Sequence, residues 1–509
     1  MKWGILFLCN SLFALKLVAQ EPADALRYSW LTPAGTARSQ AIGGAIVALG
    51  GDITSMFVNP AGTGLYKTKE IVLTPGYNFV HNKTNYLNTT QNTKDNHFTF
   101  GTSGFLLPTG SNEEEMFMWG IAVTQSGNYN NSISYSGVNN QSSYSEKYLE
   151  ELINNNVTDP NEAANAFPYG SSLAFNTYLI DTIQAAGGTV NGYRSLATPL
   201  SGVNQQQFIN TSGGMTDFVI NMASHIDDIF YLGASLTMSF IDYKRKSLFV
   251  ESDATGNTSN DFNFFQVEEY LHTKGTGANG KVGIIFKPKE NLRVGLAFHT
   301  RTLYVMEDQY STTITTDVEE YTGNGPRTQS SRDFNNGENG EYEYGMENGR
   351  RFMAGVAYVF REERDITRQR GFISADVEWV NYKVPRFYTL DLGDNPEPYF
   401  NEVNQAIDNL YKSAFNYRLG AELKFSPVMI RGGFSWYGNP YKSGEIQGGK
   451  MNICGGIGYR DKGLFIDLTY VHQITKDGFY PYQLDQGFYA PVNVHTTTGT
   501  ILMTLGFKF

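Results

Sequence analysis

The feature that most constrains this chain is a strict alternation of apolar and polar residues. At the carboxyl end, Ile501, Met503 and Leu505 share one parity, whereas Thr500 and Thr504 fall on the other. Because successive side chains of a strand point to opposite faces, this segment has one apolar and one polar face. The same alternation recurs in three earlier segments: 370–382, 413–425 and 463–474. The sequence is therefore predicted to consist largely of strands.

Fourteen segments fit this description, and fourteen is an even number. They are 70–80, 96–107, 116–126, 215–225, 230–243, 277–287, 291–303, 350–361, 370–382, 413–425, 428–438, 449–460, 463–474 and 496–509. Each has about the 9–11 or more residues that a tilted membrane strand needs. Even numbers of antiparallel strands are typical of transmembrane barrels. In such a wall, parity places Leu419 toward lipid and Thr469 toward the lumen.

The connections between these strands alternate in length. Those after even-numbered strands are short, as at 226–229 and 426–427, whereas most of those after odd-numbered strands are long. The long ones include 127–214, 244–276, 304–349 and 383–412. A soluble sandwich has no reason to gather its long loops at one end, but an outer-membrane barrel has short periplasmic turns and long outer loops. The predicted fold class is all-β, a 14-stranded antiparallel transmembrane β-barrel.

The two chain ends point to the outer membrane of a Gram-negative-type bacterium. Lys2 precedes an apolar run, and Ala19 ends a cleavage signal, so residues 1–19 are predicted to be a secretory signal peptide. Phe509 ends the last strand, as expected where the barrel-assembly machinery reads an aromatic carboxyl-terminal strand. Removal of residues 1–19 leaves Cys454 as the single cysteine, so no disulfide framework is predicted.

Nothing in the composition or the motifs indicates an enzyme, a cofactor or a nucleic-acid partner. The formal net charge is −11 and no long basic run occurs, which disfavours nucleic-acid binding. The seven histidines lack metal-ligand spacing. The segment 275–281 resembles a phosphate loop, but Val282 stands where that loop needs Ser or Thr. No catalytic, metal or cofactor site is predicted.

Residues 20–69 precede the first strand and show no alternation. Paired glycines at 43–44 and 50–51 allow tight turns and close backbone approach, and small apolar residues lie between them. About fifty residues are few for an independent core. We therefore expect 20–69 to form a small plug inside the lumen of a barrel that comprises 70–509.

The segment from Gly43-Gly44-Ala45 to Asn59-Pro60-Ala61-Gly62 resembles the FadL/TodX family of outer-membrane transporters for hydrophobic compounds. The resemblance implies that the plug closes the lumen and that ligand leaves laterally through a gap in the wall. The plug or gate residues that it implies are Gly43, Gly44, Asn59, Pro60, Ala61 and Gly62. It also implies a passive transporter of long-chain fatty acids or aromatic hydrocarbons. The implied partners are this hydrophobic ligand, outer-membrane lipids and, during biogenesis, the barrel-assembly machinery.

Two other functions stay open at this point. The first is a structural or docking barrel of a protein secretion apparatus, a role that some relatives of this family have adopted. The second is a hydrophilic porin, which a plugged lumen argues against. The sequence identifies neither the ligand nor any protein partner.

The longest outer connection, 127–214, carries signals for helices. Ser143 with Glu146 predicts a capping box, and Asp159 with Pro160 predicts a second helix start. A third apolar set falls at helical spacing: Phe175, Tyr178, Leu179 and Ile183. Either these faces pack on one another, or part of this surface is an open groove that collects hydrophobic ligand. On the second interpretation the four residues of the third set bind ligand.

Overall fold

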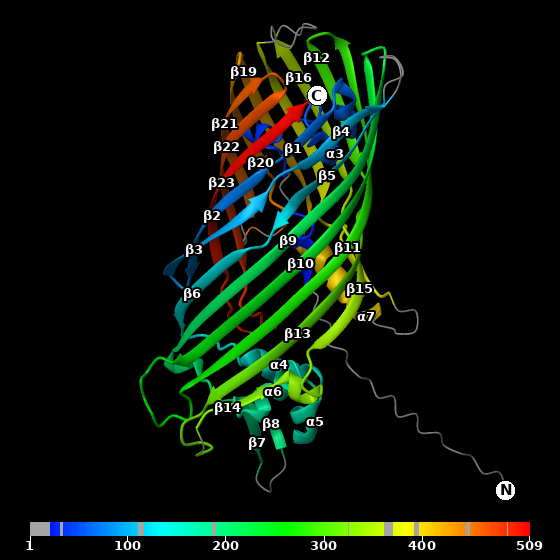
Figure 1. Cartoon of the computed structure of the whole chain (residues 1–509). Coiled ribbons are helices and arrows are strands. Elements are labelled where there is room, and N and C mark those ends of the chain that lie inside the picture. The colour runs from blue at the N-terminus through cyan, green and yellow to red at the C-terminus, as the bar shows by residue number, and fades with distance from the viewer. Residues whose placement is uncertain are drawn as a thin grey trace, which may run out of the picture.

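The computed structural model describes residues 21–30, 34–109, 117–185, 190–323, 325–360, 370–390, 397–442, 444, 448–485 and 487–509. The expected signal peptide, 1–19, lies outside these residues. The chain forms a closed antiparallel barrel of fourteen wall strands (Figure 1). β23 pairs with β1 and β2, so the last strand closes the barrel on the first. The predicted fold class and strand number are confirmed.

Several of the fourteen wall strands are interrupted and carry two labels. In chain order they are β1–β2 (Glu70–Leu73, Pro75–Tyr86), β3–β4 (Thr89–Phe100, Ser103–Thr109), β5–β6 (Phe117–Asn128, Asn131–Asn139), β9 (Val203–Ile226), β10 (Phe230–Asp253), β11 (Phe264–Lys289), β12–β13 (Leu292–His299, Leu303–Asp317), β15–β16 (Gly340–Glu347, Arg351–Phe360), β17–β18 (Gly371–Asn381, Arg386–Tyr388), β19 (Ser413–Phe425), β20 (Val428–Tyr437), β21 (Gly449–Asp461), β22 (Leu464–Phe479) and β23 (Val492–Lys508).

Many wall strands are longer than predicted. The expected loop 244–276 is wrong, because β10 continues to Asp253 and β11 begins at Phe264. The expected loop 127–214 likewise contains β6 and the first half of β9. In these extensions the outward face is largely polar and the inner face mixes apolar and polar side chains, such as Phe249 and Glu251, so the apolar-outward alternation that revealed the strands is missing. The barrel continues well beyond the apolar part of its wall.

The helices α4, α5 and α6 gather at the end of the barrel opposite the short turns, whereas α7 lies farther from that end (Figure 1). The elements of the connections are α4 (Glu146–Asn154), α5 (Pro160–Asn165), α6 (Ser171–Asn176), β7 (Ile180–Gln184), β8 (Val190–Ser195), η3 (Pro199–Ser201), β14 (Arg327–Ser330), η4 (Ser331–Phe334) and α7 (Glu397–Leu410). Among the described residues, no helix is both long and apolar enough to span a membrane.

Two of the predicted helix signals need correction. Asp159 does cap α5, because its carboxylate accepts the Asn161 N–H. The Ser143–Glu146 capping box forms only in part: the Glu146 carboxylate accepts the Ser143 N–H (3.3 Å), but the Ser143 hydroxyl donates to Glu251, and α4 begins only at Glu146. The helical spacing expected for Phe175 to Ile183 is wrong as well. α6 ends at Asn176, and Ile183 belongs to β7.

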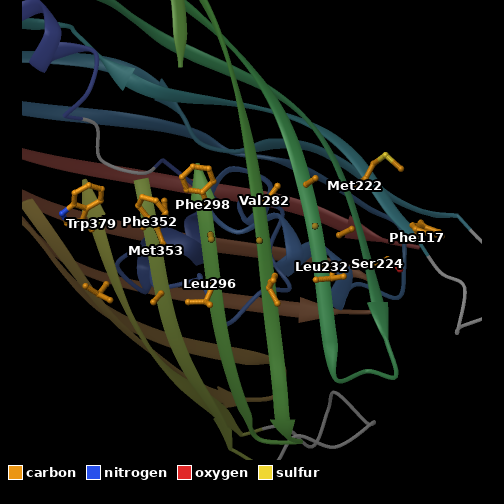
Figure 2. A pocket seen from close by; sticks show the side chains of 18 of the residues that line it. Phe117, Met222, Ser224, Leu232, Val282, Leu296, Phe298, Phe352, Met353 and Trp379 are labelled. Atoms are coloured by element: carbon orange, nitrogen blue, oxygen red, sulfur yellow. The ribbon is translucent and has the colours of Figure 1, made fainter. Parts of the chain in front are cut away.

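The outward face of the wall is an apolar belt between two aromatic girdles. Figure 2 shows Phe298, Phe352 and Trp379 side by side on β12, β16 and β17, where the register pairs them. Phe230 and Phe240 mark the two girdles on β10 and are ten residues apart. At ~3.3 Å per residue and a tilt of ~40°, this separation is ~25 Å in height, which matches the apolar band of a membrane barrel.

Leu419, on the belt, is 54% exposed, and Thr469, on the inner face, is 2% exposed. The predicted facing of both residues is confirmed. The remaining elements precede the first wall strand: α1 (Pro22–Arg27), α2 (Ala37–Ala41), α3 (Ser55–Val58) and η1 (Pro60–Leu65).

Candidate functional site: the filled lumen and a seam in its wall

The segment 34–66 lies against the inner face of the wall and is hydrogen-bonded to it on several sides. The Val47 N–H donates to the Asp376 carboxylate of β17 (2.9 Å), and Arg293 of β12 donates to the Leu49 carbonyl (2.6 Å). On the far side, Thr469 of β22 donates to the Ala37 carbonyl (2.5 Å). Side chains of the wall thus satisfy backbone groups that a buried segment without long helices leaves open.

Inward-facing glycines let this segment approach the wall backbone to backbone. We call them the glycine belt: Gly120, Gly233, Gly283, Gly295, Gly355, Gly420, Gly433 and Gly456. At Gly433 an added Cβ atom would lie 2.2 Å from the Gly43 nitrogen, and at Gly233 it would lie 2.4 Å from the Ala61 nitrogen. Such contacts leave no room for any side chain. The glycine belt therefore lets the segment 34–66 lie in direct contact with the wall.

The sequence-predicted plug residues lie at these contacts. Gly43 and Gly44 have φ of +66° and +75°, as their pairing suggested. Asn59 caps η1 through the Ala61 N–H, and its amide donates to the carbonyls of Val47 (2.6 Å) and of Ile284 in β11 (3.3 Å). Asn59 thus joins two parts of the segment to the wall. A gating role for these residues stays a prediction.

Buried charges line the same inner face. The Arg418 guanidinium pairs with Glu378, and Arg431 pairs with Glu422 (2.6 Å) and Asp467 (2.5 Å). Arg38 of α2 lies 3.5 Å from Glu422. Burial lowers the pKa of Arg38, but the carboxylates around it, Glu422 first, more than offset this and leave that pKa above its ordinary value. α2 is therefore held to the wall by a permanently charged group.

The segment 21–30 lies farther up the lumen, toward the long loops. Ala25 and Leu26 of α1 pack in one apolar cluster with Phe400 and Ile407 of α7. Arg351 donates to the Ser29 carbonyl (2.8 Å), and Lys450 donates to the Trp30 carbonyl (2.6 Å). The lumen thus contains two segments of the chain at different heights, 34–66 and, closer to the long loops, 21–30.

A cavity of about 90 Å³ lies beside the segment 34–66. Phe57 and Val58 form part of its lining, and the wall contributes both apolar and ionisable side chains. The wall residues most relevant to binding are Met215, Tyr304, Met353, Asp217, Lys281, His299, Arg351 and Glu378. Sequence reasoning missed this set because it comes from six strand segments, β9, β11, β12, β13, β16 and β17, with no local motif. The cavity has the mixed lining that an amphipathic molecule would need.

The wall is incomplete next to this cavity. β4 pairs with β5, but β3 has no backbone pairing with β5 or β6 in the part of the chain that the structure describes. Strand β5–β6 is interrupted at Tyr129 and Asn130, and β6 then crosses the inner face of β2. The Thr84 hydroxyl of β2, which points inward, donates to the Ser134 carbonyl of β6 (2.6 Å). We call this discontinuity the seam.

Side chains bridge the seam in place of a backbone ladder. The Thr93 hydroxyl donates to the Ser132 carbonyl (2.5 Å), and the Gln91 amide donates to the Ser136 hydroxyl (2.6 Å). The cavity reaches the foot of the seam at Thr124 and Ser126 of β5. The cavity therefore lies next to the seam.

A larger apolar hollow lies on the outside of the wall and is shown in Figure 2. It is lined by side chains of the apolar belt such as Leu232, Val282 and Leu296, which are 42–57% exposed. Those residues face the bilayer, so this hollow is part of the lipid-facing surface and is not the candidate site.

The four expected ligand-binding residues of the outer loop are not brought together on one open face. Leu179 is fully buried in an apolar cluster of the loop, and Phe175 packs against that cluster. Ile183 is 43% exposed on β7, and Tyr178 lies under the Arg327 guanidinium. Contact of these residues with ligand stays a prediction.

Three solved structures share this architecture. A FadL homologue from Pseudomonas aeruginosa matches with a TM-score of 0.55 at 12% identity, over 94% of this chain and 100% of that one. The toluene transporter TodX of P. putida matches at 0.52 and 10% identity, and the toluene transporter TbuX of Ralstonia pickettii at 0.50 and 13%. Each covers 94% of this chain and 99% of the other.

No protein-family model matches the sequence, and no curated protein matches it significantly. At 10–13% identity the likeness to the solved structures concerns the fold alone. The apolar belt, the fourteen strands and the shared architecture lead to one conclusion. The chain is a transmembrane β-barrel with the fold of the FadL homologue and the TodX and TbuX toluene transporters.

Proposed function

We propose that this protein is a passive outer-membrane transporter of hydrophobic small molecules, in which residues 20–69 act as a plug. The observation that carries the proposal is the seam beside the cavity, in a barrel whose axis is filled. The filled axis disfavours a porin, which needs an open channel. Ligand would enter from the long-loop end, which faces outside, and would leave sideways between β3 and β5–β6. The three solved barrels of this fold include two toluene transporters, which supports a hydrophobic ligand.

The lining of the cavity favours an amphipathic ligand of the fatty-acid type over a pure hydrocarbon. The Lys281 ammonium donates to the Thr237 hydroxyl (2.9 Å), which uses one of its three donors. Phe57 lies 5.4 Å from the same ammonium, and Met215 and Met353 add apolar surface. A carboxylate would bind Lys281 while its chain contacts these apolar groups. Toluene could contact the Lys281 ammonium only through its aromatic ring.

Closing the seam covalently should stop transport. In a Cys454→Ala background, we expect a short thiol crosslink between Gln91→Cys and Ser136→Cys to lower uptake of labelled fatty acid at least tenfold. The Gln91 amide already donates to the Ser136 hydroxyl (2.6 Å), so these two side chains meet across the seam and the crosslink should not distort the wall. Reductive cleavage of the crosslinker should restore uptake in the same cells.

The matched control crosslinks Thr315→Cys to Thr328→Cys, whose hydroxyls lie 2.9 Å apart on β13 and β14, away from the seam. This crosslink should leave uptake unchanged. Full uptake with the seam crosslinked would rule out the lateral route. If neither protein transports ligand but both copurify with stoichiometric protein partners, the alternative of a docking barrel in a secretion apparatus is favoured.

Replacing Lys281 by Met should separate the two substrate types. We expect uptake of a long-chain fatty acid to fall about tenfold, because a charge-assisted hydrogen bond contributes about 1.5–3 kcal/mol. Uptake of toluene should not change. Lys246→Met, an outward lysine of β10, is the control. Equal loss for both substrates would contradict carboxylate recognition by Lys281.

A further inference from the structure

In one sector of the outer surface, the charged side chains beyond the apolar belt are all basic. Lys83 on β2, Lys94 on β3, and His495 and Lys476 on the last two strands are exposed and share the outward parity of their strands. Lys83 lies directly opposite His495, which lies directly opposite Lys476. Lys94 lies opposite the exposed His81 of β2. We call these five residues the basic patch.

The height of the basic patch is set by the aromatic girdle on the same strands. Phe79 and Phe98 belong to that girdle on β2 and β3, and Lys83 and Lys94 are each four residues beyond it, toward the long loops. At ~3.3 Å per residue and a tilt of ~40°, these lysines begin ~10 Å beyond the hydrocarbon boundary. Their long stems can reach back toward it. The patch therefore lies at the level of lipid headgroups.

Within the residues that the structure describes, the lysines of the basic patch have no carboxylate partner. No described carboxylate forms an ion pair with Lys83, Lys94 or Lys476, although like charges facing across a sheet are destabilising. The nearby acids point the other way, because Asp95 pairs with His97 and Asp477 accepts from Tyr441, both on the inner side. The arrangement therefore needs an anion from outside the protein.

The opposite sector of the barrel lacks this imbalance. There His272 pairs with Asp242 (2.9 Å), and Lys274 of β11 lies opposite Glu307 of β13 in the register. Glu307 in turn lies opposite Glu343 of β15. This sector thus carries charges of both signs at the same distance beyond the apolar belt. A general need for solubility would not make one sector basic and the other mixed.

We propose that the basic patch is a binding site for the phosphate groups of an anionic glycolipid in the outer leaflet. Lysine ammonium groups on neighbouring strands suit the separate phosphates of a phosphorylated sugar headgroup. Outward amide side chains between them, Asn92 and Asn96 on β3 and Asn493 on β23, offer hydrogen bonds to the sugar. The acyl chains of such a lipid lie against the apolar belt below. The inference rests on the proposed outer-membrane location but not on transport.

The test is direct lipid binding by the purified full-length barrel. Native mass spectrometry and a thermal-shift titration would use diphosphorylated lipid A, its dephosphorylated form and inorganic phosphate as probes. Each basic residue near an anionic surface strengthens binding by about fivefold. The variant Lys83→Gln/Lys94→Gln/Lys476→Gln should therefore bind diphosphorylated lipid A about 100-fold more weakly than the wild type. The triple Arg variant should retain binding.

The matched control is Lys244→Gln/Lys246→Gln/Lys274→Gln in the mixed sector, which should bind lipid A like the wild type. Three results would overturn the proposal: equal weakening in both triple variants, equal binding of dephosphorylated lipid A, or unchanged binding by the patch variant. Stabilisation by inorganic phosphate at the same concentrations as lipid A would reject a lipid in favour of a free anion. Normal fatty-acid uptake by a patch variant that binds lipid A weakly would separate the lipid-binding proposal from the transport proposal.

Discussion

In a Gly433→Val variant, the segment 34–66 is expected to detach from the inner face of the wall. The first added carbon would lie 2.2 Å from the Gly43 nitrogen and 2.3 Å from the Ile42 carbonyl carbon. Both are backbone atoms, so no flexible side chain can move aside. Overpacking of this kind costs about 1–3 kcal/mol where relaxation is possible, and relaxation here means displacing the plug.

The measurement is the labelling of Ala45→Cys by a bulky maleimide in intact cells, in a Cys454→Ala background. Labelling should be slow when the wall is otherwise native and at least tenfold faster with Gly433→Val. Gly432→Val is the matched control, because Gly432 faces outward and an added carbon would meet nothing within 4 Å. Equally slow labelling in both variants, with both barrels folded, would refute a plug held by the glycine belt.

Leu419→Arg should prevent stable assembly of the barrel. Leu419 lies in the middle of the lipid-facing belt, where an arginine costs about 2–4 kcal/mol. Heat-modifiable gel mobility reports whether the variant folds, and we expect the unfolded form only. An arginine that faces the lumen should be tolerated. A folded Leu419→Arg barrel would mean that this face does not contact lipid.

The lumen control requires a side chain with space beside it. Parity alone would choose Thr469, but its hydroxyl donates to the Ala37 carbonyl, and it lies 2.7 Å from where a Cβ on Gly456 would be. An arginine there would displace α2. Thr498 of β23 also faces inward but is only partly buried, so Thr498→Arg is the suitable control. It should migrate as a folded barrel.

The alternation of side chains predicted the strands because the membrane imposes it, and the prediction ended where the membrane ends. Lys244 and Lys246 lie on β10 beyond the apolar belt, where the outward face is polar and the buried inner face mixes apolar and polar side chains, as at Phe249 and Glu251. Loop and strand then have the same composition. Strand number and facing were thus predictable, whereas strand length was not.

The candidate site was less accessible to sequence reasoning. Asn59 and the paired glycines were visible because they are close in sequence and special in conformation. The seam depends on the direction that the chain takes after Tyr129, and the cavity joins Lys281 to Glu378 across several strands. Such relations arise only when the barrel closes, so no short pattern encodes them.

The closure of the wall also dictates an order of events during biogenesis. β1 and β2 pair with β23, so the cylinder stays open until the final residues of the chain have arrived. The segment 34–66 touches backbone around the interior, through Gly233 on one side and Gly433 on the other. A body so tightly enclosed cannot thread into a finished cylinder. The amino-terminal segment must therefore already lie inside the forming barrel when the last strand joins, so that the wall closes around it.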